Sequence, residues 1–173
     1  MKTNDTREVP KMKKTIVFPS LPMRLEELIA LPEYAMTDPF QTAALTVAVL
    51  CRYEADPDET VRMLNALKGP KPLSPFEIQF LRDRLVGKGY KPFSYFIGAT
   101  PANNYTPEIP YTITIEDDPY TYQNEGYARL QLKSFGADNP RPVTLRRKAN
   151  QWLLWDQMLL ADIRTPAKDD PWA

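Results

Sequence analysis

Residues 38–51 read DPFQTAALTVAVLC, and this stretch decides the fold. It opens with a capping residue, Asp38, and then Pro39, which suits the first helical position because no backbone donor is needed there. No charged residue follows until Arg52. A helix that is apolar on all sides is buried. We therefore expect the helix that begins at Pro39 to lie at the centre of the molecule.

The same start signal occurs twice more along the chain. Residues 56–59 read DPDE and residues 74–77 read SPFE, and each places a capping side chain, a proline and then a Glu three residues after the cap. This spacing is typical of a capping box. It predicts helices from Pro57 to Lys68 and from Pro75 to Val86, and a weaker signal predicts an earlier one from Met23 to Leu31.

The predicted helix 75–86 has two apolar faces. One face carries Leu81 and Leu85, together with Ile78, and the nearly opposite face carries Phe76 and Phe80. Two apolar faces imply two packing partners. The favoured interpretation is a helix wedged between the helical layer and a sheet, and the alternative is that the two phenylalanines dock another protein.

Alternating apolar and polar residues predict strands in the second half of the chain, at residues 111–115, 127–133, 143–146 and 152–155. Ala149-Asn150 is typical of a tight turn between the last two. The expected fold class is α+β, with an N-terminal layer of about four helices (residues 20–87) packed on a C-terminal antiparallel meander (residues 111–164).

The connection between these layers, residues 88–110, is rich in aromatic residues and has no convincing period. A long irregular connection is often functional. Taken by itself, the segment is better interpreted as a proline-pinned flap that seals one edge of the core, but it is also where a binding surface is expected. With Phe76 and Phe80, the candidate binding residues are therefore Tyr90, Phe93, Tyr95, Phe96, Tyr105 and Tyr111.

The chain is interpreted as a tail, residues 1–18, followed by a single domain, residues 19–173, whose last residues form a second tail. Residues 1–18 are expected to be a flexible basic tail, because their first fourteen residues carry five cations and few apolar side chains: Lys2, Arg7, Lys11, Lys13 and Lys14. Residues 165–173 are expected to form a short C-terminal tail, with Trp172 as its anchor on the body.

Composition excludes several chemistries. The 173 residues include no histidine and one cysteine, with 22 basic and 22 acidic residues. Histidine-dependent nucleophilic catalysis and histidine-ligated metals are therefore excluded. One cysteine suggests a reducing, cytoplasmic setting. No membrane segment, metal site or cofactor is expected, and enzymatic activity is uncertain, with the balance against it.

The neutral net charge makes nucleic acid an unlikely partner, although one dense basic cluster lies at Arg141, Arg146, Arg147 and Lys148. The first hypothesis for function is a non-catalytic protein-interaction or scaffold domain. The second is a small-molecule binder, or an enzyme that works without histidine, with a pocket between sheet and helices. That pocket would need convergent polar groups such as Tyr111, Arg129 or Asp156.

Several motifs carry a resemblance to a known family: SPFEIQFLRDR (74–84), SYFIGATP (94–101) and DPWA (170–173), with supporting stretches at residues 37–40 and 152–157. Together they resemble an uncharacterised family of bacterial proteins, a domain of unknown function. The resemblance covers residue 20 to the C-terminus, implies a bacterial cytosolic setting and supplies no catalytic residues. The order of helices, then a meander ending in a tryptophan-bearing strand, is also similar to the nuclear-transport-factor-2-like cone fold.

Overall fold

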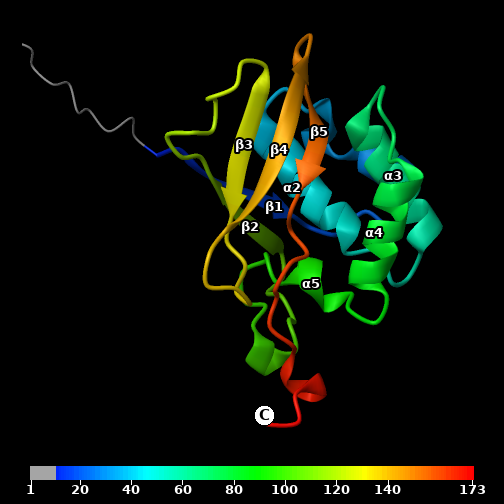
Figure 1. Cartoon of the computed structure of the whole chain (residues 1–173), viewed down its shortest axis with the longest axis vertical. Coiled ribbons are helices and arrows are strands. Elements are labelled where there is room, and N and C mark those ends of the chain that lie inside the picture. The colour runs from blue at the N-terminus through cyan, green and yellow to red at the C-terminus, as the bar shows by residue number, and fades with distance from the viewer. Residues whose placement is uncertain (1–10) are drawn as a thin grey trace, which may run out of the picture.

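The computed structural model describes residues 11–173 and confirms an α+β fold (Figure 1). Its sheet is antiparallel throughout, and the spatial order of the strands follows their order in the chain: β1 (Lys13–Phe18), β2 (Tyr111–Glu116), β3 (Tyr127–Leu132), β4 (Arg141–Lys148) and β5 (Gln151–Gln157). The helices precede β2 and are α1 (Leu25–Ala30), α2 (Pro39–Leu50), α3 (Pro57–Lys68), α4 (Pro75–Leu85) and α5 (Tyr90–Phe93). Short 3₁₀ turns occupy Pro32–Ala35, Pro101–Asn103 and Ala167–Asp169.

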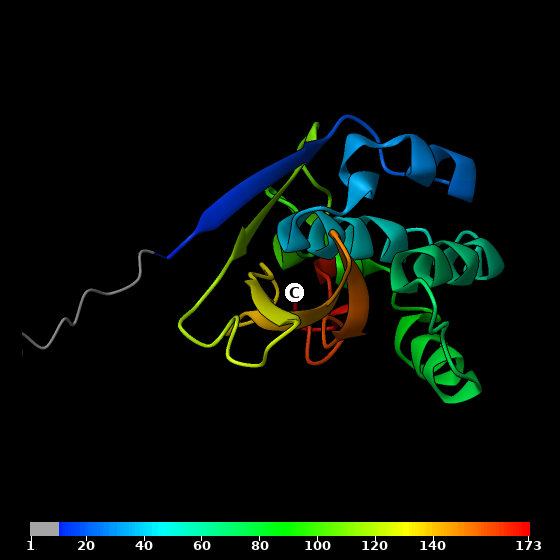
Figure 2. The same cartoon turned by 90° about the horizontal axis from the view of Figure 1, so that it is seen from above.

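The helix α2 is the centre of the molecule, as its sequence predicts. It contacts all five strands as well as α3 and α5, and every residue from Thr42 to Leu50 is buried. Seen from above, the sheet curves around one side of α2 while α3 and α4 extend away from it (Figure 2). The helical layer therefore has α2 buried at its centre and α3 and α4 at its periphery.

The three predicted capping boxes differ in how completely they form. Ser74 and Glu77 at the start of α4 exchange both hydrogen bonds of the box. At α3, Asp56 accepts from the Glu59 amide (3.1 Å), which is one half of the box, whereas at α2 Asp38 accepts from the Phe40 amide (2.9 Å), two residues after the cap and not three. The signals placed all three helix starts correctly.

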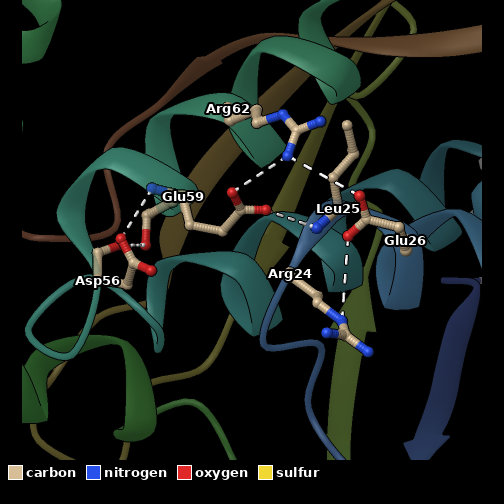
Figure 3. A network of polar contacts seen from close by, with 7 residues as sticks. Arg24, Leu25, Glu26, Asp56, Glu59 and Arg62 are labelled. Atoms are coloured by element: carbon tan, nitrogen blue, oxygen red, sulfur yellow. Dashed lines mark hydrogen bonds and ion pairs between the residues drawn. The ribbon is translucent and has the colours of Figure 1, made fainter.

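An ionic network fixes α1 against α3 (Figure 3). The Glu59 carboxylate accepts a hydrogen bond from the Leu25 amide at 2.7 Å and lies 3.4 Å from the Arg62 guanidinium. Arg62 also lies 3.9 Å from Glu26, which in turn lies 4.0 Å from Arg24. Glu59 therefore supplies the first turn of α1 with an acceptor from a different helix.

The expectation of a basic tail over residues 1–18 is wrong for residues 13–18, which form β1. This strand pairs along its whole length with β2, and Phe18 is fully buried. Lys14 pairs with Asp38, the cap of α2, and lies 5.0 Å from the centre of the Phe40 ring. The strand is not predicted from the sequence because the charges of Lys13 and Lys14 indicate a solvated end of the chain. Lys2 and Arg7 lie outside the described residues.

Side chains and backbone groups from the helical layer cover the free edge of β5. The Trp152 amide donates to the Met36 carbonyl at 2.7 Å, and its own carbonyl accepts from the Thr42 hydroxyl at 2.6 Å. Further along, the Lys68 ammonium donates to the Trp155 carbonyl at 3.2 Å. Covered edges do not recruit further strands, and these bonds fix β5 against α2 and α3.

Candidate functional site

Much of the aromatic connection is part of the core, so its expected role as a binding surface is wrong for its most buried side chains. Tyr95, Phe96 and Tyr105 are 1%, 0% and 3% exposed. The Tyr95 hydroxyl donates to the Leu159 carbonyl, and the Tyr105 hydroxyl donates to the Arg164 carbonyl at 2.6 Å. These bonds join the aromatic connection to the segment after β5. They support the interpretation of the connection as a flap that seals one edge of the core.

The remaining aromatic residues of the connection are half-buried and support the same structure. Tyr90 stacks on Tyr105 with ring centroids 5.4 Å apart, and Phe93 packs in the same small cluster. Tyr111 meets the Phe96 ring edge-on at 5.5 Å. Burial raises the pKa of Tyr105 to about 12. Tyr90, Phe93 and Tyr111 are therefore each partly packed against the domain's own core. Near the C-terminus, Trp172 is 93% exposed and is not the expected anchor.

The helix α4 does carry an exposed aromatic face. Leu81 and Leu85 are buried, whereas Phe76 is 79% exposed and Phe80 37% exposed. Ile78, expected on the inner face, is 38% exposed. The wedged interpretation is therefore wrong, because the domain supplies no second packing partner for Phe76. Of the eight candidate binding residues, Phe76 and Phe80 are the exposed ones.

Phe76 and Phe80 form one wall of a groove between α4, the end of α3 and the end of β5. The groove has a volume of about 280 Å³, close to the lower limit of ~300–1,000 Å³ for small-molecule sites. Its lining is mainly apolar and comes from distant parts of the chain: Leu50, Leu64, Lys68, Leu73, Phe76, Glu77, Phe80, Leu81, Leu154, Asp156, Gln157 and Met158. Its shape and chemistry suit a bulky apolar side chain.

A buried lysine stands at the inner end of this groove. The Lys68 side chain is 5% exposed, and its ammonium lies 3.6 Å from the Glu77 carboxylate as well as bonding to the Trp155 carbonyl. Burial acts to raise the pKa of Glu77, but the bond from the Ser74 amide and the charge of Lys68 outweigh it and lower that pKa. Lys68 and Glu77 thus place opposite charges side by side at the groove, whose lining also includes Asp156.

The polar groups suggested for a pocket do not converge between sheet and helices. Fully buried side chains of α2 pack directly on those of the strands there, so this interface is a filled core. Arg129 and Asp156 line a hollow of about 600 Å³ on the outer face of the sheet, together with Thr144 on the strand between them. Tyr111 lies elsewhere, against Phe96.

Two side chains with potential covalent chemistry, Cys51 and Lys91, have pKa values shifted by burial. Burial raises the pKa of the Cys51 thiol, and the nucleophilic form of cysteine is the thiolate. Burial, reinforced by Lys88 and Arg84, lowers the pKa of Lys91, whose ammonium is occupied by the Leu160 carbonyl at 2.9 Å. Within residues 11–173, no group of three or more acidic or cysteine side chains is placed to hold a metal ion.

Sequence reasoning found Phe76 and Phe80 but missed the rest of the groove. Leu154 belongs to a predicted strand, and nothing in the sequence indicates that its side chain meets α4. Lys68 ends a predicted helix as an ordinary last-turn cation, and its burial depends on β5, almost ninety residues later in the chain. The groove is a product of tertiary structure.

Comparison with known proteins identifies a family and no activity. The family model that matches is described as a domain of unknown function, DUF6935, and it covers residues 20–167. No curated protein and no solved structure matches the chain, so the likeness to the nuclear-transport-factor-2-like fold remains a resemblance in element order. In the described part of the chain, no helix is both long and apolar enough to cross a membrane. Since the matched residues span most of its length, the chain belongs to the DUF6935 family, a domain of unknown function.

Proposed function

We propose that this domain is a non-catalytic protein-interaction module that works in the cytoplasm and binds a segment of another protein in the groove between α3, α4 and β5. The observation that carries the proposal is the exposure of Phe76, 79% of which faces solvent on a well-defined helix beside an apolar groove. Exposed aromatic residues around a hollow are typical of protein interfaces.

The groove is built to keep its shape without a partner. The full capping box at Ser74 and Glu77 fixes the first turn of α4, and Leu81 anchors the same helix to the core. The Lys68–Glu77 ion pair joins the end of α3 to the start of α4. A preformed site loses little conformational entropy on binding, so a short segment suffices as ligand.

The occupant that fits is a protein segment with one bulky apolar side chain and negative charge beside it. The apolar wall accounts for the first requirement. The second follows from charge complementarity, because Lys68 and Leu154 also line an adjoining hollow whose other charged residues are all cations. A small apolar metabolite satisfies the first requirement only.

The proposal is tested by selecting binders from a library of random twelve-residue peptides on the immobilised domain. The selected peptides are expected to share a bulky apolar residue and to lose affinity for the Phe76→Ser variant. Truncating a central aromatic typically costs about 2 kcal/mol or more, which is roughly thirtyfold in Kd.

The matched control is Tyr120→Ser, which removes a 66% exposed aromatic from the β2–β3 connection, where it lines the outer sheet hollow and not the groove. Affinity is expected to be unchanged in this variant. Peptides that bind wild type and Phe76→Ser equally, or that fail only on Tyr120→Ser, would refute the groove as the binding site.

A further inference from the structure

A cluster of cations and aromatic rings lies next to the groove. The Lys71 ammonium is 4.7 Å and the Arg146 guanidinium 4.8 Å from the centre of the Trp155 ring. Arg146 is also 5.5 Å from the Tyr127 ring, which meets Trp155 edge-on at 5.6 Å. The two cations are therefore positioned by neutral rings, which do not compensate their charge.

The hollow beside this cluster has an unbalanced charge. It measures about 360 Å³ and is lined by Lys71, Arg146, Arg147 and Lys148, with Lys68 at its inner end and no acidic residue. Among residues 11–173, Lys68 has an acidic partner in Glu77, whereas no ion pair joins the other four to any carboxylate. Arg146 and Lys148 lie on one face of β4 and Arg147 on the other, and all three line the hollow together with Lys71. Like charges around one hollow attract an anionic ligand and affect its rate and specificity of binding.

The geometry favours carboxylates over nucleic acid. Single-stranded nucleic acids are bound by stacking bases on free aromatic faces, but Lys71 and Arg146 already lie over the Trp155 ring. The hollow also shares Lys68 and Leu154 with the apolar groove. One ligand that spans both must be apolar at one end and anionic at the other, and an acidic segment of a protein has this composition.

We infer that the partner segment is acidic, and that Asp or Glu side chains next to its apolar anchor bind in the hollow formed by Lys71, Arg146, Arg147 and Lys148. This inference rests on the proposed function, since the anchor occupies the groove. It names the class of partner: an amphipathic segment with clustered carboxylates. Binding is then salt-dependent, because exposed charges are screened over about 8–10 Å at ordinary ionic strength.

The test uses the peptides selected on the wild-type domain and measures their Kd by fluorescence anisotropy. We expect Asp and Glu to be enriched beside the apolar residue. Reversing one cation, in Arg146→Glu, is expected to weaken binding about tenfold at low salt. Lys148→Glu is the second variant, because this exposed residue ends β4 and its replacement leaves the Trp155 cluster intact. The matched control is Lys88→Glu, another exposed lysine remote from the hollow.

The outcomes separate the two proposals. Peptides that need Phe76 but show no acidic excess, and bind Arg146→Glu and Lys148→Glu like wild type, overturn the acidic-partner inference and leave the proposed function standing. Peptides that bind wild type and Phe76→Ser with the same Kd refute both the proposed function and the acidic-partner inference. Two further probes complete the design: the best peptide with Glu replaced by phosphoserine, and an oligothymidine. If the domain binds the phosphoserine peptide but not the Glu peptide, or binds the oligothymidine more tightly than the Glu peptide, the assignment to carboxylates is overturned.

Discussion

Truncating an exposed residue of α4 is expected to cost much less stability than truncating a buried one. Phe76 has only about a fifth of its surface covered, because it is 79% exposed. Full burial of a phenylalanine contributes roughly 1.5–3 kcal/mol, so Phe76→Ser removes at most about 0.3–0.6 kcal/mol of stability. Leu81 is 3% exposed and belongs to the main core. Leu81→Ala therefore costs about 2–5 kcal/mol through lost burial and the cavity that remains.

Urea unfolding followed by circular dichroism measures both values, and the slopes of the transitions show whether the folded state stays the same. Wild type and Phe76→Ser are expected to have nearly coincident transitions, and Leu81→Ala a much earlier one. A loss above about 1.5 kcal/mol for Phe76→Ser is the size of a buried side chain's contribution. That result would show that Phe76 packs against the domain, and it would refute the exposed face on which the groove proposal depends.

Two further variants test the local structure. Ser74→Ala removes the cap that accepts from the Glu77 amide, so the free energy of unfolding is expected to fall by about 1 kcal/mol; an unchanged value would mean that the box does not stabilise α4. Tyr105 has its pKa raised by burial to about 12, so the folded state resists its deprotonation and stability is present below pH ~10 and lost as the pH rises towards 12. The free energy of unfolding is expected to fall less steeply across this pH range for Tyr105→Phe, and identical falls would contradict the burial of the Tyr105 hydroxyl against the Arg164 carbonyl.

The local signals of the sequence predicted the helices well. A capping residue and a proline form a pattern only a few residues long, so it can be recognised without knowing the fold. The helices α2, α3 and α4 begin where this pattern predicts. The strand β1 was missed because its two lysines continue the basic run that precedes it, whereas in the fold Lys14 is paired with the cap of α2. The pairing of Lys14 with Asp38 joins residues 24 positions apart, so a local sequence pattern does not show it.

The site was less predictable for the same reason. Sequence alone shows that residues 88–111 are aromatic, but not that Tyr95 and Tyr105 reach carbonyls some sixty residues later in the chain. It shows two apolar faces on α4, but not which of them the rest of the domain covers. Exposure at Phe76 and burial at Lys68 both depend on where β5 lies, and long-range packing sets that position.

The most direct test of the groove is a methyl NMR titration of the domain with the tightest selected peptide. The largest shifts are expected at groove methyls, above all Met158, which is 57% exposed, and Leu154. Val17 and Ile109, 45% and 67% exposed on other surfaces, are expected to stay unmoved. Shifts concentrated at Val17 or Ile109, with Met158 and Leu154 unchanged, would contradict the central claim that this domain binds its partner between α3, α4 and β5.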